Sequence, residues 1–150
     1  MSLALRFSLL LFIPLLCGCG DGRPRRVPVA GQVLIDGEPL RSGFVRVIPD
    51  HARPATGQID RDGRFRLETF EGEDGCVLGT HRVEIIAKQS QGYTAIKWLT
   101  PKKYQDASTS ELTLAVEKPI EHWELKLSWN GEEPFIEQTF TGGDAPVKAE

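Results

Sequence analysis

Two cysteines, Cys17 and Cys19, stand two positions apart at the point where an apolar run meets the first polar residues. Thiols so placed could form a redox pair, bind a metal or take part in processing of the chain. A structural zinc site needs four ligands at regular spacing, and the neighbouring sequence supplies no others. The spacing therefore favours a processing signal over a metal or redox site.

The apolar run, residues 7–16, has the length of a segment that is removed after export. It is apolar apart from Ser8, and Arg6 is the only charged side chain before it. As a helix, about 10 apolar residues cover roughly 15 Å, which is about half of the hydrocarbon core of a bilayer. This length is typical of the hydrophobic part of a signal peptide, so we expect residues 1–18 to be cleaved.

The residues Leu16-Cys17-Gly18-Cys19 resemble a bacterial lipobox, in which an aliphatic residue and two small residues precede a cysteine. The resemblance implies that the Cys19 thiol takes a diacylglycerol group before a peptidase cuts between Gly18 and Cys19. Two or three acyl chains, such as palmitate, on one residue give stable membrane anchoring, whereas one chain is marginal. We therefore expect a lipoprotein anchored in a membrane of the cell envelope, outside the cytoplasm. The alternative is an ordinary secretory signal, or a wrongly assigned start, with both cysteines incidental.

The composition fits one domain. The chain has 150 residues and would keep 132 after cleavage, enough for a single hydrophobic core. Loss of Arg6 reduces 18 basic residues to 17, against 21 acidic ones, for a formal charge of −4. This balance argues against a nucleic-acid partner, which needs a basic face. The basic run at 23–26 either contacts anionic lipid head groups, at about 1 kcal/mol per charge, or is a solvated linker.

The cysteine count leaves no pair for an intrachain disulfide in the mature chain. Of the three cysteines, Cys17 leaves with the signal and Cys19 is acylated, so only Cys76 remains. We therefore expect burial of a core to hold the exported domain together.

The other residue types that support chemistry form no recognisable site. Asp60 and Asp62 with Gly63 suggest a calcium loop. Counted from Asp60 as position 1, however, the glycine falls at position 4, whereas an EF-hand loop needs it at position 6. A turn is therefore favoured. The three histidines stand on different expected elements without metal-ligand spacing, and no serine stands in a nucleophile-elbow motif. We expect no metal, no cofactor and no catalytic residue.

Period-two alternation dominates from residue 27 onward, and no stretch keeps a helical period over three turns. The sequence therefore predicts an all-β chain. Seven strands are expected, at residues 27–35, 44–48, 56–59, 64–70, 80–88, 111–117 and 122–129. The pairs Asp36-Gly37 and Asp62-Gly63 between apolar runs are typical of hairpin turns.

Seven short antiparallel strands with one apolar face each predict a β-sandwich, whose inner faces close a core about 10 Å thick. The residues expected to fill this core are Phe65, Leu67, Val83, Ile85, Leu112, Leu114, Val116, Trp123, Leu125 and Leu127. A linker at 19–26 would precede the sandwich at 27–129. A tail at 130–150 would follow it, with a short edge strand within 134–140 and disorder beyond Thr141.

The longest stretch without clear alternation, residues 89–110, is a candidate functional loop. It contains Tyr93 and Trp98 together with three lysines. Exposed aromatic rings can stack on sugar rings or contact peptide side chains. Tyr93 and Trp98 are therefore the candidates for an exposed ligand-binding pair, against the favoured interpretation that such loop residues just cover the end of the core.

Three stretches resemble the carboxypeptidase regulatory-like domain, a transthyretin-like β-sandwich, in the form found in small bacterial lipoproteins. They are GQVLIDGEPLRSGFVRVIP at 31–49, ATGQIDRDGRFRLETF at 55–70 and GTHRVEI at 79–85. The segment PKKYQDASTSELTLAV at 101–116 is similar to the later part of those lipoproteins. The resemblance covers roughly residues 27–129 and implies the sandwich fold together with a domain that is usually non-catalytic.

These features predict a membrane-anchored lipoprotein whose non-catalytic β-sandwich acts as a cell-envelope interaction or structural module. Its partner would be an envelope protein or a glycan that the sequence does not identify. The alternative function is a carbohydrate- or peptide-binding module that uses residues 89–104. A hydrolase or a metalloenzyme is a further hypothesis, without a visible constellation of residues to support it.

Overall fold

The computed structural model describes residues 22–138, so the signal segment, Cys19 and the chain beyond Gln138 lie outside the described residues. The strands are β1 Arg26–Val27, β2 Val29–Ile35, β3 Glu38–Pro39, β4 Gly43–Ile48, β5 Ala55–Ile59, β6 Arg64–Arg66, β7 Cys76–Val77, β8 Gly79–Ile86, β9 Lys88–Gln91, β10 Ala95–Trp98, β11 Leu112–Val116, β12 Ile120–Leu127 and β13 Ile136–Gln138. A 3-10 helix, η1, spans Lys102–Gln105.

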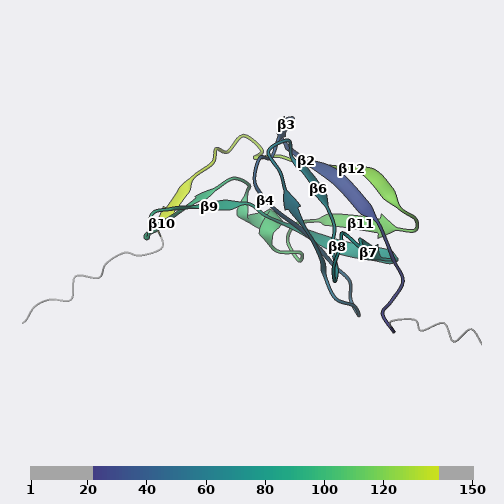
Figure 1. Ribbon diagram of the computed structural model, residues 1–150. Helices are drawn as coiled ribbons and strands as arrows, with labels where there is room; N and C mark the ends of the chain where they lie inside the picture. Colours follow the sequence, from purple (N-terminus) through teal and green to yellow (C-terminus); the bar gives the residue numbers. More distant parts are fainter. Residues whose placement is uncertain (1–21, 139–150) are drawn as a thin grey trace, which may run out of the picture.

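Two four-stranded sheets make up most of the fold (Figure 1). One sheet has the order β11-β8-β4-β5. The other joins β12, β2 and β3, with β6 also paired to β2. Smaller sheets pair β1 with β7, and β13 with β10 and β9. The chain is thus all-β with mostly antiparallel pairing, which is consistent with the predicted β-sandwich.

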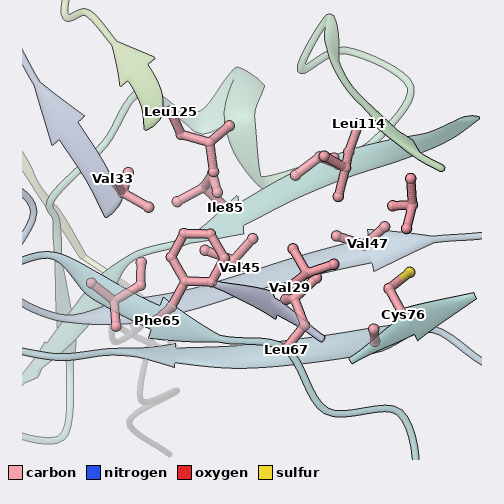
Figure 2. Packing of buried hydrophobic residues seen from close by; sticks show 14 of the residues in the cluster. Val29, Val33, Val45, Val47, Phe65, Leu67, Cys76, Ile85, Leu114 and Leu125 are labelled. Carbon is pink, nitrogen blue, oxygen red and sulfur yellow. The ribbon is translucent and has the colours of Figure 1, made fainter. Parts of the chain in front are cut away.

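The core lies between the two larger sheets. Figure 2 shows Val29 and Val33 of β2 in the same cluster as Val45 and Val47 of β4 and Ile85 of β8, and all are at most 2% exposed. Of the ten residues predicted to fill the core, eight are buried, whereas Leu112 and Trp123 are partly buried and pack against it. The period-two alternation therefore identified the buried face correctly.

The number of strands differs from the prediction. Each of the seven expected segments contains a strand, but residues 22–138 form thirteen strands. Some of the difference arises at breaks inside expected strands. Pro28 has no N–H to donate, and it separates β1, which pairs with β7, from β2, which pairs with β12 and β6.

The expectation of purely antiparallel strands is wrong for one pair. β12 runs parallel to β2, with Leu125 opposite Val33 and Leu127 opposite Ile35. β11 belongs to one sheet and β12 to the other, so the turn between them carries the chain across the core. That crossing brings β12 alongside β2 in the same direction as β2.

The two sheets are joined along one edge by backbone hydrogen bonds. Thr56 of β5 and Glu68, two residues beyond β6, exchange N–H···O bonds of 2.8 and 2.9 Å. Because β6 also pairs with β2, this isolated bridge connects the two sheets into one series of seven strands, β12-β2-β6-β5-β4-β8-β11, here called the continuous ladder. Each of these seven strands overlaps one of the seven segments that the sequence predicted.

The Asp-Gly pairs form turns as expected. Asp36 and Gly37 both have positive φ, 48° and 88°, between the paired strands β2 and β3. A two-residue turn with both central residues in the left-handed region matches the strand twist, which explains the preference for Asp-Gly here.

Candidate functional site

The small sheet of β9, β10 and β13, with the β9–β10 turn and Phe135, is here called the arm, and it contains both predicted ligand-binding residues. Figure 1 shows it at the end of the molecule opposite β7 and the start of the described chain. The register places Trp98 opposite Lys88, and Lys97 opposite Ile136. Residues 89–110, predicted as one long loop, therefore include a β-hairpin and the 3-10 helix η1. The expected edge strand within 134–140 is confirmed as β13.

Trp98 is buried, so the prediction that it forms an exposed pair with Tyr93 is wrong. Its side chain is 5% exposed, and its ring stacks on Phe135 with a centroid distance of 6.3 Å and an interplanar angle of 25°. The Nζ of Lys102 lies 5.1 Å from the centroid of the Trp98 ring. Cation–π attraction at such distances adds about 0.5–1 kcal/mol at an exposed site. The ring that stacks on Trp98 belongs to Phe135, far away in sequence, which is why the pattern of residues 89–104 did not reveal the burial of Trp98.

Glu137 of β13 links this edge strand of the arm to Trp98 by a hydrogen bond. The indole Nε1 of Trp98 donates to Glu137 Oε2 at 2.8 Å, and Lys102 Nζ donates to Glu137 Oε1 at 2.7 Å. These two hydrogen bonds, that of Lys102 first, lower the pKa of the Glu137 carboxyl below its ordinary value of 4.5. Trp98 thus has a structural role at the base of the arm.

Tyr93 is placed very differently, at the tip of the arm. It lies in the turn between β9 and β10 after Gly92, which has a φ of 69°, and its side chain is fully exposed. Two further apolar side chains of the arm are open to solvent, Ile136 at 57% and Phe135 at 39%. The arm therefore presents apolar surface at its tip and at its edge strand, although the two predicted residues do not act as a pair.

A shallow trough of about 1080 Å³ lies over β2, β5, β6 and β12, and the sequence reasoning missed it. Trp123 and Phe65 line it and pack edge to face, with centroids 5.9 Å apart. Polar side chains from neighbouring strands complete the lining, among them Gln32, Gln58 and Arg64. These are the polar positions of the alternating pattern. The missing information was which strands lie side by side.

The aspartates suspected of calcium binding form a turn. Asp60 Oδ1 accepts hydrogen bonds from the backbone N–H groups of Asp62 and Arg64 at 2.9 and 2.8 Å. Gly63 has a φ of 78°, and its carbonyl accepts from Val33 N–H at 2.8 Å. The carboxylate of Asp60 is therefore used to shape the connection between β5 and β6, as the turn interpretation requires.

The histidines do not come together with other ligands. His81 is buried, and its Nε2 lies 2.9 Å from the carbonyl oxygen of Val77, whereas His51 and His122 are exposed. Between residues 22 and 138, no three His, Cys, Asp or Glu side chains are grouped so that they could hold a metal ion.

The start of the described chain is fixed to the fold by arginines. The guanidinium carbons of Arg23, Arg26 and Arg53 lie 4.4, 4.8 and 5.2 Å from the centroid of the Phe70 ring, a group here called the arginine clamp. In addition, Arg26 Nε lies 2.7 Å from Asp74 Oδ2, and Arg23 NH1 lies 3.5 Å from Glu71 Oε1. Two arginines of the basic run at 23–26 are thus held against the domain.

Asp74 organises the loop that carries Phe70. Its Oδ1 accepts from the backbone N–H groups of Thr69 and Phe70 at 2.7 and 3.2 Å. Burial by itself raises the pKa of Asp74, but these hydrogen bonds and the adjacent Arg26 hold it below the ordinary value of 3.8. The charged carboxylate is therefore the form that the fold favours.

Comparisons with known proteins identify no relative of this chain. No protein-family model matches it, and neither a curated protein nor a solved structure does so. The resemblance to carboxypeptidase regulatory-like domains therefore stays a prediction from the quoted residues. In the part of the chain that the structure describes, no helix is both long enough and apolar enough to cross a membrane.

Proposed function

We propose that this protein is a lipoprotein of the cell envelope, acylated at Cys19, whose β-sandwich is a non-catalytic interaction or structural module. The observation that carries the proposal is the short distance in sequence between the lipobox-like segment and the fold. β1 begins at Arg26, seven residues after Cys19, and Val27 is already buried in the core. With so short a connection, acyl chains on Cys19 would hold the folded domain close to the membrane surface.

We further propose that the seven strands of the continuous ladder are the framework of a transthyretin-like sandwich. The ladder order and the Asp-Gly turns support this assignment, because they fall on the residues that carry the resemblance. The additional strands would then be elaborations on that framework, with the arm as the largest.

The acylation is tested by the intact mass of the protein purified from membranes of its native host or a close surrogate. A chain that starts at residue 19 and carries added diacylglycerol mass, with the modification absent in Cys19→Ser, is the expected result. An unmodified chain with another start would overturn the membrane part of the proposal.

A second candidate function is recognition of a peptide or a carbohydrate by the arm. The exposure of Tyr93 at the tip of the arm supports it, together with the exposed side chains of Phe135 and Ile136. Glycan and peptide arrays probed with wild type and Tyr93→Ala test this candidate. Binding that is lost in Tyr93→Ala supports it, and unchanged binding excludes the tip of the arm. Trp98→Ala is a poor probe, because removal of a buried ring disturbs the arm itself.

A further inference from the structure

The structure limits how far the domain can lie from an acyl chain on Cys19. Arg23 contacts Phe70 and Glu71, Arg26 pairs with Asp74, and Val27 pairs with Cys76 in the β1–β7 ladder. The chain is therefore attached to the domain from Arg23 onward. The tether between the acylated residue and the attached chain is then the backbone from residue 19 to residue 23, which can span at most about 14 Å when fully extended.

The arginine clamp is what makes the tether short. If residues 22–26 were a free linker, the chain between Cys19 and β1 could extend to roughly 25 Å and the domain could turn freely. The clamp holds these residues through the largely buried Arg26–Asp74 ion pair and the arginine side chains over Phe70, so the same end of the fold lies next to the anchor. Arg25, which lies within the same run, and Arg53 of the clamp are exposed, and the acidic side chain of Glu71 pairs with Arg23.

We propose that the β1–β7 end, with the arginine clamp and the adjoining loops at 50–54 and 69–75, faces the phospholipid head-group layer. The proposal rests on the proposed acylation of Cys19. The partner of this surface is the membrane, because the acyl chains enter the bilayer from Cys19, which is at most about 14 Å along the chain from Arg23. The arm lies at the opposite end in Figure 1, so this orientation directs Tyr93 away from the membrane, toward partners in the surrounding compartment.

The test uses the full chain purified from membranes and placed in phospholipid nanodiscs that contain a small fraction of lipid with a nitroxide on its head group. Single cysteines introduced as His51→Cys and Thr94→Cys carry a fluorophore at the clamp end and at the tip of the arm. Both positions are exposed, whereas the native Cys76 is 0% exposed and does not compete for the label. We expect quenching at position 51 at least threefold stronger than at position 94.

A matched variant lengthens the tether without touching the fold. Insertion of ten Gly and Ser residues after Gly20 leaves the clamp intact but adds a flexible spacer, and it should remove most of the difference between the two labels. Equal quenching at both positions in the short-tether protein, with an intact mass that shows acylated Cys19, would overturn this orientation and leave the proposed function standing. An intact mass without lipid would overturn both.

Discussion

The Nε atom of Arg26 lies 2.7 Å from the Oδ2 atom of Asp74, and this ion pair joins the first strand of the fold to the loop that carries Phe70. Both side chains are largely buried, at 15% and 18% exposure. The other oxygen of Asp74 accepts two backbone hydrogen bonds, so one carboxylate orders the loop and holds the start of the chain.

Asp74→Ala should therefore destabilise the fold by about 1–3 kcal/mol, because two backbone donors and one arginine lose their acceptor together. Urea unfolding at pH 7 measures the change. Glu71→Ala is the control, since the Glu71 side chain is 83% exposed and its pair with Arg23 spans 3.5 Å. Such exposed pairs contribute roughly 0–1 kcal/mol. Equal losses in the two variants would contradict the role given to Asp74.

The same carboxylate gives this contribution a definite pH dependence. Since the pKa of Asp74 is lower in the folded state than its ordinary value of 3.8, its stabilising effect is present above that value and is lost as pH falls through the folded pKa. The difference in unfolding free energy between wild type and Asp74→Asn should be largest near neutral pH and should shrink below about pH 4. A difference that grows in acid would contradict the assignment.

Gly75 lets the loop approach β1, and substitution there should be far more damaging than at Gly72. Both glycines have positive φ, 83° and 69°, but a Cβ on Gly75 would overlap the carbonyl oxygen of Val27, whereas Gly72 has open space around it. Gly72→Ala should cost only about 1–2 kcal/mol for its backbone conformation. Gly75→Ala should cost more and should raise the hydrogen exchange of the Val27 amide. The comparison is made by thermal unfolding and hydrogen exchange of the two variants. Equal loss of stability in both would contradict the close packing of Gly75 against Val27.

Trp98→Phe should loosen the edge of the arm without unfolding the sandwich. Phenylalanine keeps an aromatic ring against Phe135 but cannot donate to Glu137, so we expect a loss of about 0.5–1.5 kcal/mol. Faster hydrogen exchange in β13, with unchanged exchange in β4 and β8, would be the signature. Tyr93→Phe, at a fully exposed position, is the matched control and should change neither quantity. Unchanged exchange in β13 of Trp98→Phe would show that Glu137 does not hold this strand.

Cys76 should be chemically inert in the folded protein. Its side chain is 0% exposed, and burial raises the pKa of the thiol to about 11 although the Val77 amide acts in the opposite direction. At pH 8 roughly one thiol in a thousand is then ionised. A thiol reagent should modify Cys76 slowly in buffer and rapidly in guanidinium, with Cys76→Ser to assign the signal. Rapid modification in buffer would show that the core around β7 opens readily.

The alternation of the sequence located the main strands because burial of one sheet face imposes a period of two on neighbouring residues. Leu67, Val83 and Leu125 were placed in the core on that basis, and each is at most 4% exposed. The direction of β12 had no local signal. Its partner β2 lies about ninety residues earlier, and no pattern within either strand indicates whether the two run parallel or antiparallel.

The arm shows a similar limit for the candidate site. Tyr93 lies next to Gly92 in a polar segment, and its exposure follows from those neighbours. Trp98 has apolar neighbours in Ile96 and Leu99, but the ring that stacks on it belongs to the distant Phe135, which itself meets Trp129 edge to face. Burial produced by distant residues does not appear in a local pattern, and for this reason the aromatic pair was predicted wrongly.

The two-residue pairing of β1 with β7 has a mechanical consequence. A pulling force between the start of the chain and the arm would act first on this short antiparallel ladder and on the ion pair beside it, not on the seven-strand ladder behind them. Detachment of β1 would free several residues to extend, while most of the sheet hydrogen bonds stayed in place. Under load the molecule should therefore lengthen in a small first step, well before its globular part gives way.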